Sequence, residues 1–202
     1  MNTSSAPYDT SSNTSPRTGQ SSRLGTTLPL ISHTEPDAVV AYRSGTPVPA
    51  REFLADVTRV AAALPPGEHV LNVCSDRYRF TVGFAASLVA GKISLLPSTH
   101  TPEVIRQLTV FARDVFCLTD DPECEIELPR VRYPEPAEGS QAAGSGALRQ
   151  PWRVPEIDSD QLAAYVFTSG STGTPLPYKK TWGRLLRCVH DGASRIGLLD
   201  GR

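Results

Sequence analysis

A short stretch of small polar residues is the first feature of this sequence that could do chemistry. Seven of the eight residues at 168–175 are Gly, Ser or Thr. Glycines let the backbone approach a ligand closely, successive N–H groups can converge on one anion, and hydroxyls add further donors. The stretch therefore predicts an anion-binding loop, although the same composition also suits a flexible Gly/Ser turn. Two lysines a few residues later would help to neutralise a polyphosphate. The candidate binding residues are Thr168, Ser169, Gly170, Ser171, Thr172, Gly173, Thr174, Lys179 and Lys180.

Other phosphate- and metal-binding motifs are excluded. A Walker A loop does not fit, because Gly170 and Gly173 are too close together and no lysine follows Gly173. No G-x-G-x-x-G dinucleotide fingerprint is present either. The four cysteines form no C-x-x-C pair and have no nearby histidines, so we expect no zinc site. They are interpreted as reduced, mostly buried thiols, which is typical of a cytoplasmic protein.

The composition excludes several classes of partner. The net charge is −1, from 20 basic and 21 acidic residues, so the chain has no electrostatic signature of a nucleic-acid-binding protein. No apolar run reaches about 18 residues, so we expect no membrane span. His100 could face a ligand cleft, but a polar loop histidine is the simpler interpretation. His190 and Asp191 are adjacent on a helix and point apart, so they predict no catalytic pair.

The elements around the loop alternate between strand and helix patterns. This alternation predicts an α/β fold in which a mostly parallel sheet is flanked by helices. Thr101-Pro102-Glu103 is a typical helix start, with an N-cap, a proline at the first helical position and an acid in the first turn. The helix after the loop would direct the positive end of its dipole at a bound anion. We expect strands at 38–42, 69–74, 92–96, 114–118 and 162–167, and helices at 50–64, 76–90, from 101, and 181–199.

The chain divides into four segments by composition. Residues 1–28 hold thirteen Ser or Thr and almost nothing that could fill a core, so we expect a disordered tail. Residues 29–118 carry the first alternating elements and predict an α/β subdomain. Residues 119–159 are rich in Pro, Gly and Glu and predict a linker. Residues 160–202 resume with a buried strand, the loop and a helix.

The order of residues in the loop is more informative than its composition. Phe-Thr-Ser-Gly-Ser-Thr-Gly-Thr-Pro at 167–175 closely resembles the phosphate-binding motif of the adenylate-forming, AMP-binding superfamily, which includes acyl-CoA synthetases. The resemblance covers residues 36–202 and implies the early part of the large N-terminal domain of such enzymes. It also implies ATP and Mg²⁺ as cofactors and a carboxylic acid as substrate. Coenzyme A or an acyl carrier protein would then accept the acyl group.

The sequence departs from the family pattern in two respects. The family usually continues with Lys-Gly after the proline, whereas Leu176 and Pro177 stand here, so Lys179 or Lys180 would have to substitute. The later motifs that hold adenine, ribose and the catalytic lysine are absent from the 202 residues. We therefore expect a truncated AMP-binding domain of an acid-activating ligase. The alternative is a catalytically silent nucleotide- or phosphate-binding fragment, or a truncated reading frame, so whether the chain is itself an enzyme is left open.

Overall fold

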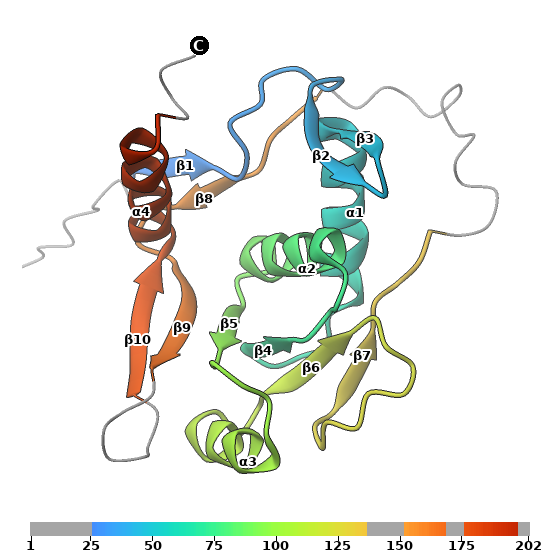
Figure 1. The fold of residues 1–202 in the computed structure, drawn as a ribbon, viewed down its shortest axis with the longest axis vertical. Helices are drawn as coiled ribbons and strands as arrows, with labels where there is room; N and C mark the ends of the chain where they lie inside the picture. Colours follow the sequence, from blue (N-terminus) through green and yellow to red (C-terminus); the bar gives the residue numbers. More distant parts are fainter. Residues whose placement is uncertain (1–25, 137–151, 169–175, 198–202) are drawn as a thin grey trace, which may run out of the picture.

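A six-stranded sheet lies at the centre of the molecule (Figure 1). The structure is a computed structural model that describes residues 26–136, 152–168 and 176–197. The strand order is β10-β9-β5-β4-β6-β7, and the strands run parallel except β10, which is antiparallel to β9. The predicted α/β fold with a mostly parallel sheet is thus confirmed. The strands are β4 (His69–Asn72), β5 (Ile93–Leu96), β6 (Phe116–Thr119), β7 (Arg130–Arg132), β9 (Leu162–Thr168) and β10 (Leu176–Thr181).

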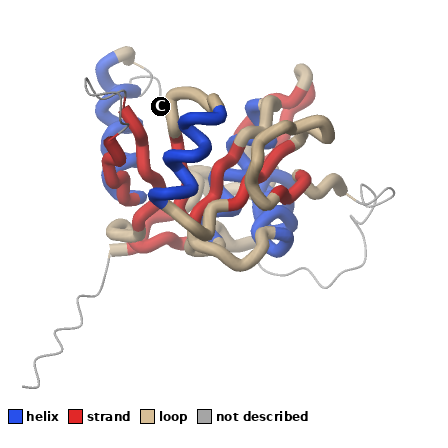
Figure 2. The backbone as a smooth tube through the Cα atoms, turned by 90° about the horizontal axis from the view of Figure 1, so that it is seen from below, coloured by secondary structure: helices blue, strands red, loops and turns tan. Residues whose placement is uncertain are grey.

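Helices cover both faces of this sheet. Helices α1 (Ala50–Ala63) and α2 (Arg77–Val89) pack on one face, and α3 (Pro102–Phe111) packs on the other. Figure 2 views the molecule from the α3 side. Neighbouring β4 residues belong to different cores, Val70 to the α1–α2 side and Leu71 to the α3 side. Successive side chains of a strand point to opposite faces, so one short apolar strand serves both layers.

A glycine allows α2 to approach the sheet closely. A Cβ on Gly83 would lie 2.6 Å from Asn72 Nδ2 and 2.7 Å from a methyl carbon of Leu118. Asn72 is held in place because its Nδ2 donates to the Phe80 carbonyl at 2.9 Å. The contact fixes α2, and therefore the start of α2, relative to β4.

The helix starts follow from local sequence. The Thr101 hydroxyl accepts the Val104 N–H at 3.4 Å and Pro102 begins α3, as predicted. In the same way the Asp76 carboxylate accepts the Arg79 N–H at 2.9 Å and caps α2. Both caps stand where the chain leaves the carboxyl edge of the sheet.

One strand begins inside the segment predicted to be a tail. Thr27–Pro29 form β1, which pairs antiparallel with β8 (Glu156–Asp158). Leu28 packs against the core, so the prediction of a tail that extends to residue 28 is wrong for its last residues. Composition missed this strand because its partner lies about 130 residues away in sequence. Residues 1–25 lie outside the described residues.

The predicted linker at 119–159 also contains regular structure. Strand β7 adds an edge to the central sheet, and β8 forms the ribbon with β1 beside the start of α4 (Trp182–Arg195) (Figure 1). The prediction of a linker is therefore wrong for these two strands. Both are three residues long, too short to show a period in the sequence. Residues 137–151 lie outside the described residues.

A small hairpin precedes α1. Strands β2 (Val39–Arg43) and β3 (Thr46–Pro49) are joined by Ser44 and Gly45, whose φ angles are 49° and 82°. Two successive positive φ values are typical of the tight turns that suit the twist of a hairpin. Strand β3 leads directly into α1, and Val48 of β3 and Phe53 of α1 join the core.

Candidate functional site

The predicted anion-binding loop joins two paired strands at the carboxyl edge of the sheet. Strand β9 is parallel to β5, so its last residue, Thr168, lies at the edge where the parallel strands end. Thr168 pairs directly with Leu176, the first residue of β10. The seven residues between them therefore connect the two strands of a hairpin. Most of the predicted site lies outside the described residues, namely Ser169, Gly170, Ser171, Thr172, Gly173 and Thr174.

The base of the loop is anchored in the core. Phe167, the residue before Thr168, is buried, and its ring contacts that of Phe111 on α3 with the centroids 5.4 Å apart. The Phe111 ring also meets Tyr165 edge-on at 4.9 Å. Ala164 is fully buried beside Ser94 of β5. These contacts fix the strand that enters the loop, which is a requirement for a preorganised binding site.

The two predicted lysines lie on β10, away from the base of the loop. Lys179 pairs with Tyr165 and Lys180 with Ala164. At about 3.4 Å per residue, the Lys179 backbone lies about 10 Å along the strand from Leu176. Adjacent strand residues point to opposite faces of a sheet. Lys179 therefore lies on the same side of the sheet as α3, like its partner Tyr165, and Lys180 lies on the other side. Each lysine thus presents its charge to a different side of the hairpin.

The expected helix dipole does not act at the loop. Strand β10 separates the loop from α4, and this strand was not predicted. The first N–H groups of α4 are engaged elsewhere: Trp182 N–H donates to the Gln161 carbonyl and Gly183 N–H to the Ser159 carbonyl, both at 2.9 Å. Ser159 and Gln161 precede β9, at the edge of the sheet opposite to Thr168. The predicted contribution of this helix to anion binding is therefore wrong.

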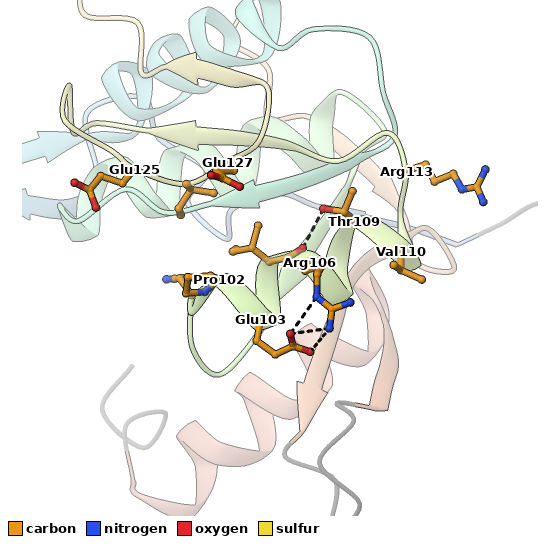
Figure 3. A pocket seen from close by; sticks show the side chains of 11 residues that line it. Pro102, Glu103, Arg106, Thr109, Val110, Arg113, Glu125 and Glu127 are labelled. Atoms are coloured by element: carbon orange, nitrogen blue, oxygen red, sulfur yellow. Dashed lines mark hydrogen bonds and ion pairs between the residues drawn. The ribbon is translucent and has the colours of Figure 1, made fainter.

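A large cavity runs along α3. Its volume is about 940 Å³, and its walls are formed by α3, by His100 and by the irregular segment at 125–127. Figure 3 shows Arg106 beside Glu103 on α3, with Glu125 and Glu127 on the opposite wall. Desolvation lowers the pKa of His100, which favours its neutral form. His100 therefore borders a cavity, but it lines the side of α3 rather than the loop at 168–175.

A second, more apolar pocket lies between α3 and the β9–β10 hairpin. Its volume is about 420 Å³. Phe167 and its cross-strand partner Pro177 form one wall, and Val104, Leu108 and Phe111 contribute to the other. The pocket faces the α3 side of the sheet beside the base of the loop. Arg106 and Gln107 also line it, and both donate hydrogen bonds to the Glu103 carboxylate.

The described residues place one possible metal-ligand cluster at the opposite edge of the sheet. Glu68, His69 and Asp114 each bring a ligand atom within 4.8 Å of the others. The Asp114 carboxylate already accepts the Glu68 N–H at 2.5 Å and lies 2.7 Å from His69 Nδ1. The Glu68 N–H and the contact with His69 lower the pKa of Asp114 although partial burial opposes this. Hydrogen bonding accounts for the arrangement without a metal.

Sequence reasoning missed one polar residue at the carboxyl edge. Asp120 follows β6 directly, and its side chain is only 4% exposed. The sequence carried a signal: an acid immediately after a predicted parallel strand lies at the edge where helix starts gather. Arg79 at the start of α2 contacts both Asp120 and Glu135.

Comparison with known proteins identifies the fold. No family model matches the sequence, and no curated protein matches it. Among solved structures, the chain is similar to o-succinylbenzoate CoA synthetase (MenE) from Bacillus subtilis in complex with the acyl-adenylate intermediate OSB-AMP, with a TM-score of 0.62 and 18% identity. That match covers 85% of this chain and 47% of the MenE chain. The same synthetase with ATP and magnesium ion gives a TM-score of 0.61, 18% identity and coverage of 85% and 48%.

A second group of neighbours gives the same assignment. The Klebsiella oxytoca NpsA N-terminal subdomain, in complex with 3-hydroxybenzoyl-AMSN, matches with a TM-score of 0.52 and 18% identity. This match covers 72% of this chain and 37% of the chain in the NpsA subdomain structure. The chain therefore has the fold of the N-terminal part of adenylate-forming enzymes. It spans about half the length of the MenE structures.

Proposed function

We propose that this chain is the phosphate-binding N-terminal part of an ATP-dependent ligase that activates a carboxylic acid. The observation that carries the proposal is the position of the Thr-Ser-Gly-Ser-Thr-Gly-Thr-Pro sequence. It stands between two paired strands, at the carboxyl edge of a parallel sheet. Ligands of open α/β folds bind at this edge. The neighbours with the same fold include complexes with ATP and magnesium ion and with an acyl-adenylate.

The proposed chemistry assigns a role to the loop. In the complete enzyme the carboxylate attacks the α-phosphate of ATP, which gives an acyl-adenylate and pyrophosphate. Backbone N–H groups of Gly170 and Gly173 and the hydroxyls of Thr168, Ser171 and Thr172 would hold the β- and γ-phosphates. These donors would also follow the charge that develops on the departing pyrophosphate. Mg²⁺ would bind together with ATP and offset the negative charge of its phosphates.

The lysines of β10 have a subordinate role in this proposal. Lys179 and Lys180 begin about 10 Å or more from the base of the loop and point to opposite faces. One of them would contribute through the electrostatic field at the phosphates.

The acyl acceptor would be the thiol of coenzyme A or of a carrier protein. The described residues include no helix long and apolar enough to cross a membrane. The buried thiols of Cys74, Cys117 and Cys124 are not in disulfides, which supports a reducing, cytoplasmic location.

The second candidate is a phosphate-binding unit without catalytic activity. The observation that favours it is that Leu176 and Pro177 stand where the family that the loop resembles usually has Lys-Gly. If this chain exchanged pyrophosphate into ATP only in the presence of a carboxylic acid substrate, a unit without catalytic activity would be excluded. Binding of MgATP without exchange would support it.

Titration calorimetry with MgATP tests the assignment of the loop. Gly173→Val places a β-branched side chain where close approach of a phosphate is expected. Loss of one charge-assisted hydrogen bond corresponds to about 1.5–3 kcal/mol, so we expect Kd to rise at least about tenfold. Gly192→Val on α4 is the matched control, because open space surrounds the position of its Cβ. Equal affinity of both variants would contradict the proposed function.

A further inference from the structure

The strand order creates a crevice of the kind that binds phosphate in other doubly wound sheets. Strand β4 lies between β5 and β6. The chain leaves β4 through α2 on one face and leaves β6 through a segment whose Ile126 and Leu128 pack on the α3 face. The two connections therefore diverge at the carboxyl ends of neighbouring parallel strands. Ligands bind outside the strands at such a point.

In this protein a carboxylate of the chain fills the crevice. Asp120 Oδ1 accepts the Ser75 N–H at 2.8 Å and the Ser75 hydroxyl at 3.2 Å. Asp120 Oδ2 accepts the Asp76 N–H at 3.1 Å and lies 3.9 Å from the Arg79 guanidinium. Two backbone N–H groups, a hydroxyl and a guanidinium at a helix start form the donor set of a phosphate site. We call these four groups the cradle.

The surroundings hold this carboxylate in its charged form. Burial opposes the charge of Asp120, but the hydrogen bonds from Ser75 and Asp76 outweigh it and lower its pKa. Arg79 is fixed in turn by Glu135 at 2.5 Å and by the Tyr133 ring, whose centroid lies 5.4 Å from the guanidinium carbon. The buried Arg79 Nε has no hydrogen-bond partner among the described residues. The cradle is thus rich in donors and holds one internal anion.

We propose that Asp120 acts as an internal anion that closes an anion site at the start of α2 and so confines phosphate binding to the loop at 168–175. The second half of this statement rests on the proposed function, whereas the first half does not. Asp120 is then a specificity-determining residue, because it removes a competing phosphate site at the same edge of the sheet. An open cradle there would bind phosphate too far from β9 for the loop to act on it, since β5 lies between β4 and β9.

Anion rescue of an Asp120 variant tests the proposal. Asp120→Ala removes the acceptor of the Ser75 and Asp76 N–H groups, so we expect Tm to fall by about 3–6 °C. Inorganic phosphate at ten times its Kd favours the native state about 11-fold and should restore about 3–5 °C. The amide resonances of Ser75 and Asp76 should shift in the same titration. Formate, which matches the deleted carboxylate, should act similarly.

Asp121→Ala is the matched control. Asp121 is the adjacent carboxylate, it is exposed, and its acceptor contact is with the Glu123 N–H rather than with the cradle. At equal ionic strength we expect phosphate to stabilise Asp121→Ala and the wild type equally, and less than Asp120→Ala. If Asp120→Ala is unfolded in chloride, phosphate at about 100 mM should refold it by mass action.

Three results would overturn the proposal. Phosphate could stabilise all three proteins equally, an unfolded Asp120→Ala could fail to refold in phosphate, or phosphate could shift the Ser75 and Asp76 amides of the wild type. The last result would show that the cradle is open. Failure of the proposed function would give a different result. Phosphate would still rescue Asp120→Ala, but it would not shift the amide resonance of Thr168.

Discussion

Replacement of Gly83 by alanine should destabilise the protein even though alanine is the better helix former. In an open helical position this exchange stabilises by about 1 kcal/mol. At Gly83 the new Cβ would lie 2.6 Å from Asn72 Nδ2 and 2.7 Å from Leu118, both of which are buried. Overpacking of this kind costs about 1–3 kcal/mol. Displacement of Asn72 would also break its bond to the Phe80 carbonyl, worth about 1 kcal/mol. The net loss is about 1–3 kcal/mol.

Thermal unfolding followed by circular dichroism measures this effect. The net loss corresponds to a Tm lower by about 3–10 °C for a chain of this size. Gly192→Ala is the control, because Gly192 is also helical and has nothing within 4 Å of the position of its Cβ. Its Tm should stay the same or rise slightly. Equal Tm values for the two variants would refute the argument that Gly83 sets the distance between α2 and β4.

Three further predictions concern the segments around the core. Removal of residues 1–25 should leave Tm unchanged, whereas removal of residues 1–29 should lower it because β1 is lost; equal Tm values would show that β1 contributes nothing. Asp114 has a lowered pKa, so its contribution to stability is complete above the ordinary value of 3.8 and is lost as pH falls through the lower folded value. The Tm difference between wild type and Asp114→Asn should therefore shrink below pH 3.8, and a constant difference would contradict this. Lys179→Ala and Lys180→Ala should weaken MgATP binding unequally, because the two side chains point to opposite faces, and each should weaken it less than Gly173→Val; equal effects in calorimetry would be inconsistent with that geometry.

The central layers of the fold could be predicted because each element carries its own signal. Residues 50–64 have apolar positions at helical spacing, and α1 occupies Ala50–Ala63. Thr101-Pro102-Glu103 starts α3 through interactions that lie within four residues of each other. Buried parallel strands such as β9 show as continuous apolar runs. In all these cases the deciding interactions are local in sequence.

The remaining elements depend on contacts that are remote in sequence. The β1–β8 ribbon pairs Leu28 with Ile157, and neither three-residue strand has a recognisable pattern. Strand β10 contains Pro177 and two lysines, which disfavour a strand, but it pairs along the whole of β9. The helix begins at Trp182, close to the predicted residue 181, but the hairpin places this start at the opposite edge of the sheet, so the expected helix dipole does not reach the loop.

The candidate site was predicted only in part for the same reason. The composition of 168–175 indicated an anion-binding loop, and the fold places its first residue at the carboxyl edge of the sheet. Sequence spacing suggested that both lysines lie close to the loop, but an extended strand carries them about 10 Å away. Asp120 could not be recognised as an internal anion, because its partners Ser75 and Asp76 are about 45 residues away and meet it only in the folded sheet.

A two-dimensional ¹H–¹⁵N NMR titration of the 202-residue chain with pyrophosphate tests the central claim most directly. The account predicts that the amides of Thr168 and of the loop that follows it shift, that Gly173→Val abolishes these shifts, and that the amides of Ser75 and Asp76 do not move. Shifts at Ser75 and Asp76 without a response at Thr168 would contradict the account, because phosphate would then bind at the start of α2 rather than at the loop.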